Sequence, residues 1–296
     1  MAQATDSWTV KRLLEWTSAF FTRKEVDSPR LSAELLLAHV LKIERIRLYT
    51  DYERPLQEEE LVTYRELVRR AGEHEPIAYL TGKAHFFDLE LDIVAPVLIP
   101  RPDTETLVEN VLQFVKHTPG FESPRIADLC TGSGCIALAL AKHIPQAHVA
   151  AVDIDPKAIE LTKQNAQKLG LGDRVTVLQG DLFEPLSELV DPGPFHLIVS
   201  NPPYIPSADI AKLDRNVRDF ESRLALDGGV DGLAYHRRLL AGAAERLLPC
   251  GRLYMEIAFD QGEKVMALAM AQAGLSEPKL LRDYGGKDRV LVASKA

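Results

Sequence analysis

The chain has 296 residues, 46% hydrophobic and 26% charged, which is typical of a globular protein with room for one large and one small domain. A formal net charge of −8 argues against a basic surface for bulk nucleic acid, so we expect no direct nucleic-acid binding. Three cysteines without metal-ligand spacing, a polar start at residues 1–6 and no long apolar window predict a cytoplasmic protein with no disulfide framework, metal or membrane span.

The chain from residue 8 to about residue 72 has the apolar spacing of helices. The first helical stripe consists of Val10, Leu13, Leu14, Trp16 and Phe20. Ser28-Pro29, an N-cap residue followed by proline, predicts the start of a second helix that continues to Leu41. A third helix is predicted over residues 57–71, with Leu61, Tyr64 and Leu67 on one face. We therefore expect a helical domain over residues 1–75, followed over 76–105 by a linker with a β-hairpin near 86–94.

Strands and helices alternate in the rest of the chain, residues 106–296, after a helix predicted from Thr104 to about His117. Strands are predicted at Arg125–Leu129, His148–Asp153, Val175–Gln179, Phe195–Ser200, 252–257 and 289–293. Helices are predicted between them from Cys135 and over residues 156–169, 233–248 and 261–273. Alternating strands and helices predict an α/β domain with a mainly parallel sheet covered on both faces.

The loop over residues 128–134 joins the first strand of this series to its helix. Gly132 and Gly134 allow the backbone to approach a ligand closely. With Ala137 the loop fits the G-x-G-x-x-A dinucleotide pattern, so alone it does not separate NAD from another nucleoside, and a tight turn without ligand stays open. Asp153 ends the second strand, where a carboxylate can bind both ribose hydroxyls, and Asp155 is expected to cap the following helix.

Asp181 and Leu182 follow the third strand, where the adenine edge of a nucleoside is expected. Asp181 is a candidate acceptor for the adenine amino group, and Leu182 is a candidate contact for the ring. A hydrophobic wall beside a solvated acid is an equally good interpretation.

Asn201-Pro202-Pro203-Tyr204 follows the fourth strand and is the most informative motif. The Asn oxygen and a backbone carbonyl can accept two N–H bonds, the prolines make the turn rigid, and the Tyr ring offers a flat face. The motif favours methyl transfer to an amide or exocyclic amino nitrogen, with an ordinary Pro-rich turn as the alternative. A dehydrogenase has no need of it. Because ligands bind at the carboxyl ends of strands, all four segments are expected to meet in one crevice.

Taken together, these motifs resemble the HemK/PrmC family of release factor glutamine methyltransferases over nearly the whole chain. The matching segments are residues 27–31, 33–39, 75–82, 98–105, 128–134, 201–204, 219–221, 226–233 and 285–289. The resemblance implies a seven-stranded Rossmann-like class I methyltransferase sheet behind a small N-terminal helical domain that helps to recognise the substrate. It also implies S-adenosyl-L-methionine as cofactor, with S-adenosyl-L-homocysteine as product. The substrate would be the glutamine of the Gly-Gly-Gln motif in class I peptide chain release factors.

The resemblance also implies the roles of individual residues. The cofactor contacts fall on Cys130, Thr131, Gly132, Ser133, Gly134, Asp153, Asp181, Leu182 and Asn201. The glutamine pocket falls on Asn201, Pro202, Pro203 and Tyr204, and Asn201, Pro202 and Tyr204 are the expected catalytic residues. Many methyltransferases carry Gly where this chain has Cys130, and we favour inert packing of that thiol over a ligand contact. Arg101 and Glu105 either close the pocket or form a local salt bridge.

Three other functions are compatible with parts of the sequence. One is a glutamine methyltransferase of a ribosomal protein, against which the matches at residues 27–31 and 101–105 weigh. A second is an adenine amino-methyltransferase of nucleic acid, against which the acidic charge weighs. A nucleoside-binding regulatory module is the third, and it gives the rigid acceptor turn no purpose. We expect a monomer.

Overall fold

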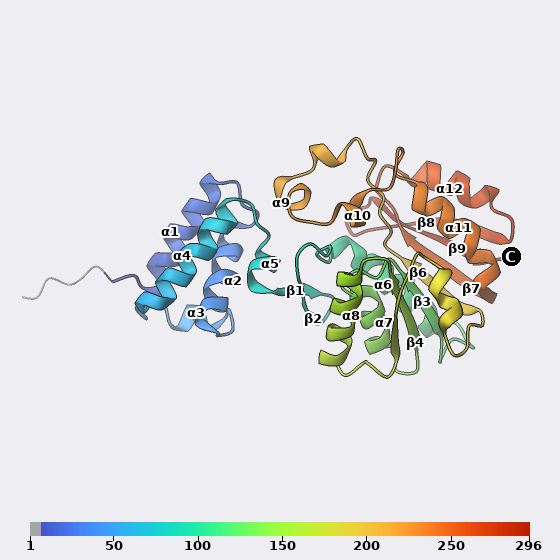
Figure 1. Cartoon of the computed structure of the whole chain (residues 1–296), viewed down its shortest axis with the longest axis horizontal. Coiled ribbons are helices and arrows are strands. Elements are labelled where there is room, and N and C mark those ends of the chain that lie inside the picture. Colours follow the sequence, from blue (N-terminus) through green and yellow to red (C-terminus); the bar gives the residue numbers. More distant parts are fainter. Residues whose placement is uncertain (1–6) are drawn as a thin grey trace, which may run out of the picture. The chain divides into compact units, whose positions relative to one another are not determined.

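The computed structural model describes residues 7–296, so the polar start at residues 1–6 lies outside the described residues. The chain forms two compact units (Figure 1). The first consists of residues up to Lys83 together with Asp214–Phe220, and the second of Ala84–Leu213 and Glu221–Ala296. Within the described residues, no helix is both long and apolar enough to cross a bilayer.

Packed helices build the first unit. Its helices are α1 (Val10–Arg23), α2 (Pro29–Leu41), α3 (Arg47–Thr50), α4 (Glu58–Gly72), α5 (Ile77–Thr81) and the short α9 (Arg215–Arg218). Leu14, Leu36 and Tyr64 are fully buried in its core. On α1 the helical period places Phe21 in this core, whereas Trp16 is 47% exposed and stacks on Phe20 with ring centroids 5.4 Å apart. The predicted stripe therefore includes one residue, Trp16, that lies at the edge of the buried face.

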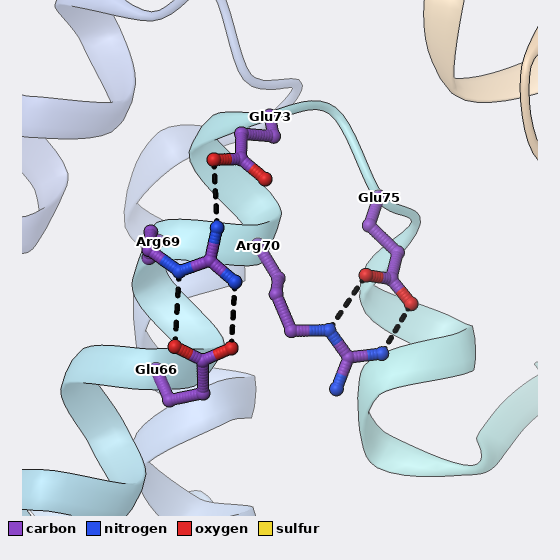
Figure 2. Close-up of polar contacts among 5 residues, drawn as sticks. All are labelled: Glu66, Arg69, Arg70, Glu73 and Glu75. Carbon is purple, nitrogen blue, oxygen red and sulfur yellow. Dashed lines mark hydrogen bonds and ion pairs between the residues drawn. The ribbon is translucent and has the colours of Figure 1, made fainter.

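The start of α2 differs in detail from the prediction. Pro29 occupies the first helical position as expected, but Ser28 has φ of +46° and its side chain makes no capping bond. The Ser32 hydroxyl instead donates to the Asp27 carbonyl at 2.7 Å. Figure 2 shows Arg70 paired with Glu75, which ties the end of α4 to the segment before α5.

A seven-stranded sheet forms the centre of the second unit. The strands are β3 (Arg125–Leu129), β4 (His148–Asp153), β5 (Val175–Gln179), β6 (Phe195–Ser200), β7 (Leu247–Glu256), β8 (Leu275–Arg282) and β9 (Asp288–Lys295). Their order is β5-β4-β3-β6-β7-β9-β8, with β9 antiparallel to both neighbours and the other pairs parallel. The predicted α/β class and mainly parallel sheet are confirmed.

Helices cover both faces of the sheet (Figure 1). One core layer involves α6 (Glu105–His117), α7 (Cys135–His143) and α8 (Pro156–Lys168) together with the hairpin β1 (Lys83–Phe86) and β2 (Leu89–Asp92). The opposite layer involves α11 (Ala234–Arg246) and α12 (Gly262–Ala271). The short turns are η1 (Pro102–Thr104), η2 (Glu184–Glu188), η3 (Ile210–Lys212) and α10 (Arg223–Leu226).

The strand order reverses beside β3, which pairs with β4 on one side and β6 on the other. In open α/β sheets a crevice forms at such a reversal, outside the carboxyl ends of the strands. Residues 130–134 follow β3, and residues 201–204 follow β6. Asp153 ends β4, and residues 180–182 follow β5. The topology therefore brings the four predicted segments to one edge of the sheet.

Candidate active site

A crevice opens at the carboxyl ends of these strands, which is where open α/β sheets bind small-molecule ligands. The predicted residues that line it are Cys130, Gly132, Asp153, Asp181, Leu182, Asn201 and Pro203. Thr131 and Ser133 are buried in the loop behind it, and Gly134 is the N-cap residue of α7. Pro202 and Tyr204 do not line the crevice. The residues that the sequence did not indicate include Val97, Leu98, Ile154, Ala158, Ser222 and Tyr235.

Hydrogen bonds from side chains of α8 fix the 128–134 loop. The Thr162 hydroxyl donates to the Gly132 carbonyl at 2.9 Å, and Asn165 Nδ2 donates to the Ser133 carbonyl at 3.0 Å. Asn165 also exchanges hydrogen bonds with the backbone of Asp92 on β2, at 2.8 and 3.1 Å. With its carbonyls held on the protein side, the loop has a defined shape before any ligand binds.

Asp128 supports the same loop from inside the protein. Its Oδ2 accepts from the Thr131 hydroxyl at 2.6 Å and from the Ala137 N–H at 3.1 Å. Burial raises the pKa of Asp128 to about 7, and the negative charge of Asp153 adds to the rise, although the two hydrogen bonds oppose it. Asp128 is therefore a structural acid beneath the loop, and it does not line the crevice.

Two positions in the loop have left-handed backbone that bears directly on ligand approach. Gly132 has φ of +58°, and a Cβ added there would meet no atom within 4 Å, so the backbone is open on that side. Cys130 has φ of +63°, a conformation that favours glycine and gives a physical reason for the Gly that many methyltransferases carry there. The Cys130 side chain both lines the crevice and packs against the core, and burial raises its thiol pKa. Its thiol is consequently protonated at neutral pH.

Asp153 is already engaged with the backbone on both carboxylate oxygens. Oδ2 accepts from the Gly132 N–H at 2.8 Å, and Oδ1 accepts from the Asp155 N–H at 2.9 Å. Each oxygen keeps a further lone pair, so the group can still accept from two hydroxyls. Burial raises the pKa of Asp153. Asp155 caps α8 as expected, accepting from the Lys157 N–H at 2.9 Å.

Asp181 and Leu182 form the wall of the crevice after β5. Asp181 Oδ2 accepts from Arg238 Nη2 at 2.7 Å, so this acid is paired on one oxygen. Leu182 is buried, with φ of +51°. Tyr235 on α11 lines the same crevice, and it follows the matched segment 226–233 by two residues, which is the one sequence signal that could have indicated it.

The 201–204 turn is held by groups outside the motif. Asn201 Nδ2 donates to the Thr104 hydroxyl at 3.1 Å, and none of the described residues donates to Asn201 Oδ1. Tyr204 donates from its hydroxyl to Glu256 Oε1 at 3.3 Å, and its carbonyl accepts from Gln261 Nε2 at 2.9 Å. The Tyr204 hydroxyl thus binds a buried acid rather than lying open, and burial raises its pKa.

The glycines of residues 226–233 pack directly against this turn. A Cβ on Gly232, whose φ is +75°, would lie 2.4 Å from the Tyr204 carbonyl oxygen. We expect Gly232→Ala to destabilise the protein by about 2–5 kcal/mol, because backbone strain and overpacking add. Urea unfolding measures this. Gly170→Ala is the matched control, since Gly170 has φ of +68° and an added Cβ there meets nothing within 4 Å. Equal losses in both variants would contradict the packing argument.

Arg101 and Glu105 do not pair with each other. Arg101 Nη2 donates to Glu221 Oε1 at 2.7 Å, whereas Glu105 accepts from the Phe87 N–H at 2.8 Å. Burial raises the pKa of Glu221, and Arg101 opposes that rise. Next to Glu221, the Ser222 N–H donates to the Pro96 carbonyl, so the 101–221 ion pair lies beside two segments of the crevice wall. The local salt bridge between Arg101 and Glu105 was a wrong alternative.

Two protein families match separate segments of this chain. Residues 12–82 match the PrmC N-terminal domain, and residues 104–230 match the methyltransferase small domain. A release factor glutamine methyltransferase of Rhodopirellula baltica is 43% identical over 98% of this chain and 97% of its own length. The Geobacter sulfurreducens enzyme of the same name is 40% identical over 98% of both chains. A Pyrococcus furiosus methyltransferase has the same fold, with a TM-score of 0.50 at 18% identity over 77% of this chain and 97% of its own.

Proposed function

The chain belongs to the family of release factor glutamine methyltransferases, and we propose that its 201–204 turn holds the glutamine side chain beside the crevice that holds the methyl donor. The protein methylates the side-chain amide nitrogen of the glutamine in the Gly-Gly-Gln motif of class I peptide chain release factors. Its methyl donor is S-adenosyl-L-methionine. The observation that carries the site assignment is the Asn201 amide, which is anchored through Nδ2 and whose Oδ1 accepts from none of the described residues.

The residues of the crevice fit this donor. Asp153 keeps a lone pair on each oxygen for two ribose hydroxyls, and Gly132 leaves its side of the loop open. When bound, the donor supplies a methyl group on positively charged sulfur, a charge that the acids of the crevice favour. The proposed contacts are Cys130, Thr131, Gly132, Ser133, Gly134, Asp153, Asp181, Leu182 and Asn201. Thr131, Ser133 and Gly134 act through the backbone, because their side chains or Cβ positions face the protein.

The turn is suited to activating an amide nitrogen. Such a nitrogen is a weak nucleophile because its lone pair is delocalised into the carbonyl group. Asn201 Oδ1 and the Pro202 carbonyl accept its two N–H bonds, orient the lone pair and stabilise the positive charge that develops on nitrogen. No strong base is needed, since a methylated, protonated amide is very acidic. Pro203 and Tyr204 complete the pocket, with Tyr204 held in place by Glu256 and Gln261.

We further propose that residues 1–75 recognise the release factor, that 76–105 are a linker and that 106–296 are the catalytic domain. The match of residues 12–82 to the PrmC N-terminal domain supports a separate role for this part of the chain. We also propose that the protein is a cytoplasmic monomer and that it does not bind nucleic acid directly. Its net charge of −8 favours the absence of nucleic-acid binding.

A parallel labelling assay tests the substrate. Purified protein is incubated with methyl-labelled S-adenosylmethionine and, separately, an unmethylated class I release factor, ribosomal protein and DNA, and the labelled atom is mapped by mass spectrometry. We expect label on the side-chain nitrogen of the Gly-Gly-Gln glutamine. Label on a ribosomal-protein glutamine or on the adenine amino group, with none on the release factor, would support one of the rival functions.

A further inference from the structure

Glu256 is a buried carboxylate directly behind the 201–204 turn, at the carboxyl end of β7. Its side chain is 1% exposed, and Oε1 accepts from the Tyr204 hydroxyl at 3.3 Å. Among the described residues, no donor pairs with Oε2. Burial raises the pKa of Glu256 to about 7, whereas interactions with the Thr104 hydroxyl, Arg289 and Tyr204 lower it. Burying a carboxylate is costly, so a function for this group is expected.

Thr104 connects this carboxylate to Asn201. Its hydroxyl accepts from Asn201 Nδ2 at 3.1 Å, and it lies near enough to Glu256 to lower the pKa of that carboxyl. A threonine hydroxyl has a single proton. If that proton points to Glu256, the hydroxyl accepts from the Asn201 NH₂ group, which leaves Asn201 Oδ1 for the substrate. If it points to Asn201 instead, the amide turns round and presents a donor to the glutamine N–H bonds.

We propose that Glu256 is a positioning residue for methyl transfer, which accepts from the hydroxyls of Thr104 and Tyr204 and thereby keeps the Asn201 oxygen directed toward the substrate amide. The inference rests on the role proposed above for Asn201. Neither Glu256 nor Thr104 lines the crevice, so both act through Asn201 and the turn and not by touching a ligand.

The surroundings hold Glu256 in place for this role. His236 Nε2 donates to the Glu256 backbone carbonyl at 3.0 Å. Burial lowers the pKa of His236 to about 4, so this histidine stays neutral. Gln261 Nε2, from the segment after β7, donates to the Tyr204 carbonyl oxygen. The charged and titratable groups around the carboxylate are Arg289 on β9, Asp103 in η1, Tyr204, His236 on α11 and Cys135 on α7.

A dependence of turnover on pH follows. Below a pH of about 7 Glu256 takes up a proton and no longer accepts from both hydroxyls, so kcat falls on the acid side and reaches its plateau above that pH. Asp128 also has a pKa raised to about 7, but it lies beneath the donor loop. Its protonation affects donor affinity, which is measured separately.

Substitutions at Thr104 provide the sharpest test, since valine keeps the shape and serine keeps the hydroxyl. In the full chain, with an unmethylated class I release factor as substrate, we expect Thr104→Val to lower kcat by about tenfold to a hundredfold. Its KM and its affinity for S-adenosylmethionine, measured by calorimetry, should stay within about threefold of wild type. Thr104→Ser should retain most of the turnover. Equal impairment of both variants, or normal kcat in Thr104→Val, would overturn the proposal.

Glu256→Gln gives a second, independent readout. We expect a similar loss of kcat and a profile without the acid limb near pH 7. Donor binding and thermal unfolding establish whether the variant folds, and if it does not, the Thr104 pair alone decides. An unchanged acid limb in a folded Glu256→Gln protein would contradict the role of Glu256. If the wild-type protein does not methylate the release factor at all, the proposed function fails, independently of these variants.

Discussion

Replacing Asn201 by alanine is expected to lower kcat by about 100-fold or more, equivalent to roughly 3 kcal/mol of transition-state stabilisation. The variant loses the acceptor that orients the glutamine nitrogen and stabilises its developing charge. Asn201 Nδ2 makes one hydrogen bond, to Thr104, so the fold loses little. The rate of methyl transfer to a release factor is measured at saturating donor, which removes any change in donor affinity.

Asn110→Ala is the matched control for this measurement. Asn110 lies on α6, where its side chain donates to the Thr106 carbonyl at 2.8 Å, and it does not line the crevice. The control should turn over at the wild-type rate. Turnover of Asn201→Ala close to that of the control would remove Asn201 from the mechanism.

Replacing Asp153 by asparagine is expected to weaken the affinity for S-adenosylmethionine by about 30-fold to 1000-fold, since hydrogen bonds to a charged group contribute about 1.5–3 kcal/mol each. In the wild-type protein the Asp153 carboxylate accepts hydrogen bonds from the N–H groups of Gly132 and Asp155. Asparagine removes the negative charge and places an NH₂ group against one of these two N–H groups. Isothermal titration calorimetry with the donor measures the effect directly.

Asp173→Asn serves as the control for Asp153, because Asp173 is an exposed acid outside the crevice. It should bind the donor normally. Turnover of Asp153→Asn should recover in part at high donor concentration, since the glutamine pocket is intact. A donor affinity within about threefold of wild type would show that this carboxylate does not hold the ribose.

The strands that position the site could be predicted closely from the residues. Those at Arg125–Leu129, His148–Asp153, Val175–Gln179 and Phe195–Ser200 have the predicted bounds, because each is a short apolar run that ends at a turn or a polar residue. Strand β8 was not predicted from the residues. It lies at the edge of the sheet, contains Pro278 and has no buried residue, so neither an apolar run nor regular alternation marks it.

Some residues of the site stand in short sequence motifs, whereas others reach it only through contacts between distant parts of the chain. Gly132, Asp153 and Asn201 stand in short motifs at strand ends, where topology alone brings them together. Thr104 and Glu256 do not. Thr104 precedes Asn201 by 97 residues and Glu256 follows Tyr204 by 52, and only the packing of η1 and β7 around the turn brings them into contact with it. Thr104 falls in the matched segment 98–105, but nothing in that segment, nor in an acid at a strand end, indicates these contacts.

The buried Asn165 side chain joins β2, α8 and the 128–134 loop through its hydrogen bonds to Asp92 and Ser133. The entropy of ordering that loop is therefore lost when the chain folds, and not at each encounter with a small molecule. A preorganised binding loop of this kind gains affinity without additional contacts, and the product can leave without the loop unfolding. The loop can therefore bind and release ligand in many successive turnovers while it stays folded.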